Sequence, residues 1–297
     1  MGKEHKISQQ RLFNAWFIAG TVFALLFLTY SILYATKIWD IQTLEIERSL
    51  LLRPITRVDC MFFEWRNLGE FPASLIIVCI LGGISILAGF RRRVLLFLLL
   101  LLIVGVGAEL VGKKLIHVPF PSTLRSGITV LECPQLNGKP FADRFAAATA
   151  QWSKIPDPPH VQVSWAHDVY QMPFVFKAGE TENSFPGGHA MRWCFLGLVE
   201  CWLSWRLIRN RVLRVFFATL FFIGAFLGGF MQFWIGVHFI TDTISGYLLG
   251  AALACYAISL LTRNDPRRLQ DLQGHPQYPA MDNRIALSSN VKQRGPF

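Results

Sequence analysis

Two similar stretches of the sequence each stand at the start of an apolar segment. The first is SFPGGHAMRW (Ser184–Trp193), and the second is GVHFITDTISG (Gly236–Gly246). Each places glycine and histidine directly before a run of apolar residues. Because a run of about 20 apolar residues can cross a bilayer as a helix, these stretches predict the ends of two membrane spans.

The composition of the whole chain also indicates a membrane protein. Of its 297 residues 53% are hydrophobic and only 16% are charged, whereas soluble domains average about 25% charged residues. We therefore predict an all-α integral membrane protein with six transmembrane helices. The six apolar segments are Leu12–Ala35, Ala73–Phe90, Val94–Val111, Ala190–Ile208, Val215–Val237 and Thr243–Thr262. Only Arg91–Arg93 separates the second from the third, which predicts a tight hairpin.

Basic residues predict the orientation of these spans. Lys and Arg gather at the N-terminus, in the turns after the second and fourth spans, and directly after the sixth. Cytoplasmic loops carry such an excess, so both termini are predicted to be cytoplasmic. Topology then accounts for the net charge of +10. A nucleic-acid partner would need a basic face with reading side chains, which the sequence lacks, so we exclude one.

The spans and loops predict one membrane domain followed by a tail. Residues 1–263 form the membrane domain, with outer loops at 36–72 and 112–189, and the second loop is predicted to cap the outer face. Residues 264–297 are polar and predicted to be a disordered cytoplasmic tail. Cys60 and Cys133 both lie in outer loops and would pair if that side is oxidising. Sequence alone does not place them within bonding distance.

Four ionisable residues stand at the outer ends of predicted spans. They are Lys114, His189, His238 and Asp242. Ionisable groups at membrane depth are costly and therefore candidates for function. The spacing between the two histidines fits one span inward, a basic turn and one span outward. Both histidines should thus return to one surface, where Lys114 ends the third span.

The residue types around these histidines suit phosphoryl transfer. Asp242 follows His238 by four residues, so on a helix it can orient the ring and leave Nε2 as a nucleophile. Gly187 and Gly188 would let backbone N–H groups approach an anion at a helix N-terminus. His189 would donate a proton to the leaving oxygen. This chemistry depends on positioning and charge, and we predict no metal or cofactor.

Each feature also has a structural interpretation. A histidine at a helix start can be a cap, and His238 with Asp242 can be only a hydrogen-bonded pair. Lys113 and Lys114 can be interfacial anchors, which fits Lys113 best. Arg192 can face lipid headgroups. Glu109 and Glu200, inside predicted spans, fit structural pairing. The convergence of three segments on one layer favours the functional interpretation.

The motifs resemble the type 2 phosphatidic-acid phosphatase superfamily. SFPGGH and GVHFITD carry the resemblance, which covers roughly Val104–Gly250. It implies six spans and a phosphohistidine on His238, oriented by Asp242. It also implies that His189 protonates the leaving group and that Lys114 is the lysine of the first motif.

Three departures from the family pattern concern groups that hold phosphate. Gly187 stands where the family has serine, Gln232 where it has arginine, and Pro121-Ser122 near its Arg-Pro pair. Candidate replacements are Arg125, Arg192 and Lys177. Together with Lys114, Gly187 and Gly188, Arg125 and Arg192 form the predicted phosphate-binding set.

Two longer stretches are similar to the bacterial lipid A phosphotransferases within this superfamily. These stretches are NSFPGGHAM and IGVHFITDTISG. The likeness implies a bacterial inner membrane, an active site that faces the periplasm, and a polyprenyl diphosphate as phosphoryl donor. It does not identify the acceptor.

We predict phosphoryl transfer on a lipid-linked phosphate or diphosphate, by hydrolysis or by transfer to an acceptor. The protein's partners would be this substrate and membrane lipids. A pseudo-enzyme that binds a lipid phosphate without turnover is the first alternative, because expected arginine and serine residues are missing. A transporter or channel would need broken helices or polar residues within spans, of which there are few. A scaffold would leave the matched histidines unexplained.

Overall fold

The computed structural model describes residues 2–36, 57–116 and 183–264, together with residues 38, 39, 42, 43 and 46. The predicted cap and tail therefore lie largely outside the described residues. The same holds for Arg125, Lys177 and the Cys133 side of the possible disulfide.

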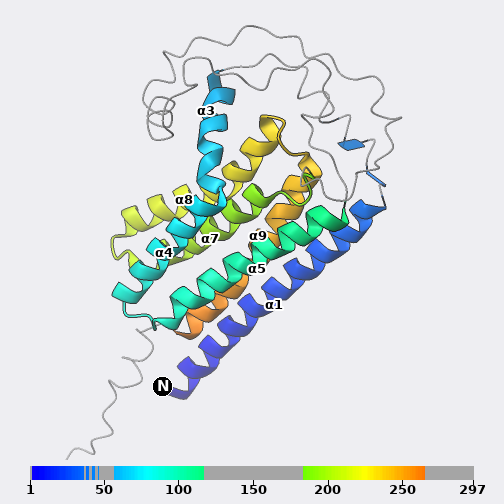
Figure 1. Cartoon of the computed structure of the whole chain (residues 1–297). Helices are drawn as coiled ribbons and strands as arrows, with labels where there is room; N and C mark the ends of the chain where they lie inside the picture. The colour runs from blue at the N-terminus through cyan, green and yellow to red at the C-terminus, as the bar shows by residue number, and fades with distance from the viewer. Residues whose placement is uncertain are drawn as a thin grey trace, which may run out of the picture.

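Six long helices coincide with the six predicted spans and confirm the all-α membrane fold (Figure 1). They are α1 (Gly2–Ala35), α4 (Phe71–Leu87), α5 (Arg93–Leu115), α7 (Gly188–Leu207), α8 (Arg211–Trp234) and α9 (Ile240–Arg263). Four of them contain segments long and apolar enough to cross a membrane by themselves, namely α1, α5, α8 and α9. The apolar helix α4 has only 17 residues, and charged residues such as Arg192 and Glu200 reduce the hydropathy of α7.

Two shorter elements lead into α4. Helix α3 covers Arg57–Trp65, and the 3-10 helix η1 covers Arg66–Gly69. Helix α3 contacts α8, and η1 contacts α4, α7 and α8. These elements hold the start of α4 against the end of the bundle that carries His189 and His238, which we call the histidine end.

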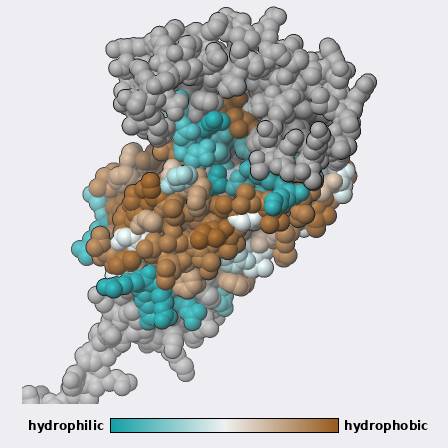
Figure 2. All heavy atoms as spheres, in the orientation of Figure 1, coloured by the Kyte–Doolittle hydropathy of each residue, from teal (hydrophilic) through white to brown (hydrophobic). Residues whose placement is uncertain are grey.

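Helix α7 is central to the bundle, since it packs against both α8 and α9, while α1 lies along α9. The core residues come from α4, α5, α7 and α9 and include Val78, Leu98, Leu102, Phe195 and Leu253. Many large apolar side chains on α1, α5 and α8 remain exposed. Figure 2 shows them as a hydrophobic band between more hydrophilic ends, the surface that a lipid bilayer would cover.

Glycines let α7 and α9 approach closely at the histidine end. A Cβ on Gly246 would lie 2.3 Å from the Gly187 carbonyl oxygen, and one on Gly250 would lie 2.5 Å from that of Met191. Small residues at helix interfaces permit such contacts in membranes. The close packing brings the first turn of α7 beside the first turn of α9.

Two short turns connect consecutive helices. Between α4 and α5, Gly89 has a φ of 93° and the Phe90 N–H donates to the Ser85 carbonyl at 3.0 Å. The turn confirms the hairpin expected at Arg91–Arg93. Between α8 and α9, Gly236 has a φ of 70° and reverses the chain just before His238.

Candidate functional site

The two predicted catalytic histidines lie together at the histidine end. His189 is in the first turn of α7, and His238 is in the turn before α9. Their ring centroids are 6.4 Å apart, with an angle of 54° between the ring planes. Two hydrogen-bond lengths amount to roughly 6 Å, so one tetrahedral phosphoryl group can contact both rings.

Asp242 lies beside His238 at the start of α9. Its Oδ2 atom is 3.6 Å from His238 Nδ1 and accepts the Phe239 N–H at 3.1 Å. Asp242 is fully buried and His238 is 3% exposed. The distance to the ring exceeds a hydrogen bond, but such contacts are often long before substrate binds. The backbone bond fixes the carboxylate where it can orient the imidazole.

Glu70 contacts His189 and was not anticipated from the sequence. Its Oε1 atom is 3.3 Å from His189 Nε2. The hydrogen bond to His189 lowers the pKa of Glu70 to about 2, so the carboxylate is ionised at neutral pH. The sequence signal that could have identified Glu70 is its position before Phe71-Pro72, just ahead of the second predicted span. Each histidine therefore has a carboxylate neighbour.

Arg192 forms a buried ion pair with Glu109. Its Nη1 is 2.6 Å from Glu109 Oε2, and its Nε donates to the Gly69 carbonyl at 2.5 Å. Lys113 Nζ donates to Glu109 Oε1 at 2.8 Å. This cluster joins α5, α7 and η1. Glu109 and one lysine thus have the structural pairing that we expected, whereas Arg192 has protein partners besides any phosphate.

Lys113 points into this cluster, whereas Lys114 is exposed. This differs from the expectation that Lys114 faces the site and that Lys113 is the anchor. On α5, Lys113 follows Glu109 by four residues and shares its face. Lys114 is rotated about 100° further around the helix. Helical phase therefore makes Lys113 the lysine nearer to the buried charges.

The two glycines before His189 let neighbouring groups approach closely, and the Gly187 N–H has a protein partner. The Gly187 N–H donates to the Asp242 carbonyl at 3.0 Å, and a Cβ on Gly187 would lie 2.8 Å from that oxygen. A Cβ on Gly188 would lie 2.0 Å from Glu109 Oε1. Gly187 therefore supports α9, and Gly188 admits the Glu109 carboxylate. The N–H groups of the first turn of α7 are the backbone donors that an anion would approach there.

Gln232, at the position where the resemblance predicts an arginine, is fully buried near the base of the His238 turn. Its carbonyl accepts the N–H groups of Val237 at 2.9 Å and His238 at 3.2 Å. Neither amide atom of its side chain has a hydrogen-bond partner within the described part of the chain. A buried amide without partners is unfavourable, and its NH₂ group could donate to a phosphate oxygen.

The described residues contain no group of three His, Cys, Asp or Glu side chains that could hold a metal ion. The charged and polar groups described at the histidine end include two imidazoles, the carboxylates beside them, the Arg192 cluster and the Gln232 amide. They can supply a nucleophile, a proton and positive charge to an anionic group.

Comparisons with known proteins agree with this geometry. The sequence profile of the PAP2 superfamily matches residues 93–266, from the start of α5 to just beyond α9. A solved structure with a similar fold is described as the first transmembrane PAP2 type phosphatidylglycerolphosphate phosphatase from Bacillus subtilis. The TM-score is 0.56 at 17% identity, covering 82% of this chain and 96% of that one. No curated protein matches the sequence.

Proposed function

Because this chain belongs to the PAP2 superfamily, we propose that it transfers a phosphoryl group from a lipid-linked phosphate or diphosphate to water or to a lipid acceptor. The observation that carries this proposal is the 6.4 Å separation of the His189 and His238 rings at one end of a membrane bundle. A phosphate at the headgroup level of a lipid would contact both rings.

The proposed reaction has two steps. His238 Nε2 attacks phosphorus while the bond to the leaving oxygen breaks, and His189 gives that oxygen a proton. Asp242 orients the His238 ring during attack. Water, or the hydroxyl of an acceptor, then attacks the phosphohistidine, and His189 takes up its proton. Hydrolysis and transfer differ only in this second step.

The charge of the phosphoryl group would be balanced by groups at the start of α7. Lys113 and Arg192 carry two positive charges beside the single negative charge of Glu109. The first N–H groups of α7 and the amide of Gln232 would donate hydrogen bonds to phosphate oxygens. Arg125 remains a candidate outside the described residues. Preorganised donors of this kind supply most of the catalysis in phosphoryl transfer.

Glu70 would help the buried His189 ring to take up and keep a proton. An ionised carboxylate beside an imidazole favours the charged ring, and the low pKa of Glu70 keeps it ionised at neutral pH. His189 could then serve as a general acid for a poor, alkoxide-like leaving group.

We further propose a bacterial inner membrane location with the histidine end facing the periplasm and both termini in the cytoplasm. Exposed arginines at the opposite end of the bundle support this orientation. They include Arg91, Arg92, Arg93, Arg209, Arg211 and Arg263. Residues 1–263 would form one membrane unit, with 264–297 as a tail. A lipid phosphate and a polyprenyl diphosphate are both candidate substrates.

A lipid-phosphate-binding pseudo-enzyme is the second candidate. Glu109 already neutralises part of the charge on Arg192 and Lys113, and Gln232 brings no charge. Such a site would bind a phosphate but stabilise its transition state poorly.

Purified protein should be incubated with lipid phosphates and diphosphates, with and without a lipid acceptor. Free phosphate and phosphorylated lipid would both be measured. His238→Ala should reduce turnover at least about a hundredfold and abolish the acid-labile phosphoprotein. His275→Ala, outside the PAP2 match, should behave like the native protein. Unchanged turnover in His238→Ala would exclude the proposed nucleophile, and binding without turnover in the native protein would favour the pseudo-enzyme.

A further inference from the structure

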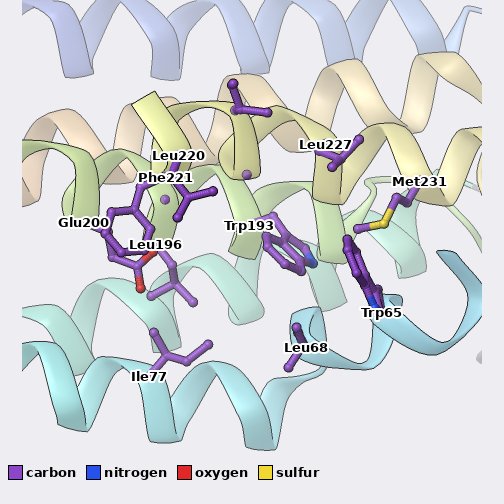
Figure 3. Close-up of a pocket in the computed structure, with 13 residues that line it drawn as sticks. Trp65, Leu68, Ile77, Trp193, Leu196, Glu200, Leu220, Phe221, Leu227 and Met231 are labelled. Atoms are coloured by element: carbon purple, nitrogen blue, oxygen red, sulfur yellow. The ribbon is translucent and has the colours of Figure 1, made fainter. Parts of the chain in front are cut away.

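A cavity of about 550 Å³ lies between α4, α7 and α8, within the hydrophobic part of the bundle (Figure 3). Apolar and aromatic side chains form nearly all of its wall. Its lining includes Trp65, Trp193, Leu196, Glu200, Gly224 and Met231. The volume falls within the usual range for small-molecule sites, roughly 300–1,000 Å³.

The cavity extends from the histidine end toward the middle of the bundle. Its wall on α8 runs from Met231 back to Leu220, a rise of about 16 Å. This is close to half of a bilayer core about 30 Å thick, the depth of one leaflet. In Figure 3, Trp65 and Met231 lie at one end and Glu200 at the other.

Gly69 connects the outer end of the cavity to the proposed catalytic site. A Cβ on Gly69 would lie 2.6 Å from Trp193 Nε1 and 3.0 Å from His189 Cδ2. The indole of Trp193 and the His189 ring therefore border the same space beside Gly69. A lipid whose phosphate contacts His189 would have its chain beside Trp193.

Two polar side chains of the cavity wall lack partners among the described residues. Trp193 Nε1 is buried and has no hydrogen-bond acceptor among the described residues. Glu200 is the one ionisable residue of the lining, and no hydrogen bond or ion pair joins it to the described part of the chain. A carboxyl group inside a membrane span is costly and marks a functional position by default.

We propose that this cavity binds one apolar chain of the phosphorylated lipid substrate. The Trp193 N–H donates to an oxygen near the headgroup, and the carboxyl of Glu200 ends the apolar stretch and limits the length of chain that fits. This inference rests on the proposed function for the identity of the lipid. A donor beside the catalytic end that has no acceptor among the described residues favours a chain attached to the bound phosphate over a bulk bilayer lipid.

Gly224 offers a substitution that fills the cavity without disturbing the bundle. A Cβ on Gly224 meets only Trp193 Cζ3, at an ordinary 3.9 Å, so Gly224→Leu places its side chain in the cavity. Gly107 on α5 is exposed and a Cβ there meets nothing within 4 Å. Gly107→Leu is therefore the matched control on a lipid-facing surface.

Turnover should be compared between dipalmitoyl and dibutyryl phosphatidic acid, which share a headgroup. In Gly224→Leu, kcat/KM for the long-chain lipid should fall about tenfold or more, with little change for the short-chain lipid. Glu200→Leu should accept longer chains than the native protein, whereas Glu200→Gln should not. Equal turnover of both lipids in Gly224→Leu and the native protein would overturn the inference.

A second measurement does not require turnover. The His238→Ala protein is exposed to phosphatidic acid that carries a photoactivatable group near the end of one chain. Label should map to α7 and α8 near Glu200, disappear with Gly224→Leu, and persist with Gly107→Leu. Label there without turnover in the native protein would refute the proposed function alone. No label, or label spread over the lipid-facing residues of α1 and α5, would refute the chain site.

Discussion

His189 and His238 each lie beside a carboxylate, but the two pairs differ in environment. Asp242 is fully buried and fixed by the backbone of its own helix turn. Glu70 comes from a different segment, and its side chain is 49% exposed. A buried carboxylate suits the orientation of a nucleophile. A more exposed one suits a proton donor that must be recharged from water.

At the residue scale, we predict that Glu70→Gln slows only reactions that need a proton donor. Gln keeps a polar group beside His189 but removes the charge that favours its protonated form. Turnover of alkyl lipid phosphates should fall roughly ten- to a hundredfold, within the usual effect of general acid catalysis. The alkaline limb of the pH–rate profile should move to lower pH. Steady-state rates across pH would measure both effects.

Two comparisons make this prediction specific. An aryl phosphate, whose leaving group needs no proton, should be hydrolysed by Glu70→Gln at the native rate. Asn67→Ala, in the same η1 segment, should leave both substrates and the pH profile unchanged. Equal losses on aryl and alkyl phosphates with an unshifted profile would show that Glu70 has only a structural role.

At the scale of elements, α7 connects the parts of the site. Its first turn carries His189, and its Arg192 binds η1 and Glu109 of α5. Glycines of α9 let that helix pack closely alongside α7. Burial of an ion pair is compensated only when the partners are well placed. The Arg192–Glu109 contact at 2.6 Å satisfies this condition and ties α5 to α7.

We predict that removing either partner of the Arg192–Glu109 pair strongly destabilises the protein. Glu109→Leu leaves a buried guanidinium, and Arg192→Met removes one of the two cations beside Glu109, so each should lower the free energy of unfolding by about 3–5 kcal/mol. The double variant should lose less than the sum of the two, because it no longer leaves the Arg192 guanidinium buried without its carboxylate. The free energies of unfolding of the native protein, both single variants and the double variant would be measured in detergent or bicelles. Additive losses would contradict a direct tie between the helices.

The same variants separate the two roles considered for Arg192. If Arg192 also contacts the phosphate, the losses of turnover in the two single variants should add in the double variant although their losses of stability do not. If Arg192 only ties the helices together, the losses of turnover and of stability should both be less than additive.

At the scale of the whole molecule, the bundle has two chemically different ends joined by an apolar band. The histidine end carries the paired imidazoles and carboxylates, while the opposite end carries exposed arginines. In Figure 1 the N-terminus and the α4–α5 turn lie at this opposite end. A lipid held between these ends would present its phosphate to His189 and His238.

We predict that green fluorescent protein fused to either terminus of the full chain fluoresces in bacterial cells. Alkaline phosphatase fused to the C-terminus should be inactive, because it folds only outside the cytoplasm and basic ends stay inside. Active alkaline phosphatase at the C-terminus would reverse the proposed orientation and place the histidine end in the cytoplasm.

Much of the fold could be predicted from the sequence because the length of an apolar segment is a local property. Backbone groups in lipid must be satisfied within the segment, so a run of about 20 apolar residues specifies a helix. The positions of His189 and His238 at the ends of such runs then predicted that they share a layer. Cap and tail lie largely outside the described residues and stay predictions.

The partners within the site depended on tertiary structure. Whether Lys113 or Lys114 faces inward is set by the rotation of α5 against α7. Glu70 reaches His189 only because η1 packs beside α7, and Glu109 takes the space that Gly188 leaves open. The sequence by itself determined the six helices and the level of the histidines, since hydrophobic length acts along the chain. Packing between distant segments decided which charges meet, since that depends on helix rotation and side-chain volume.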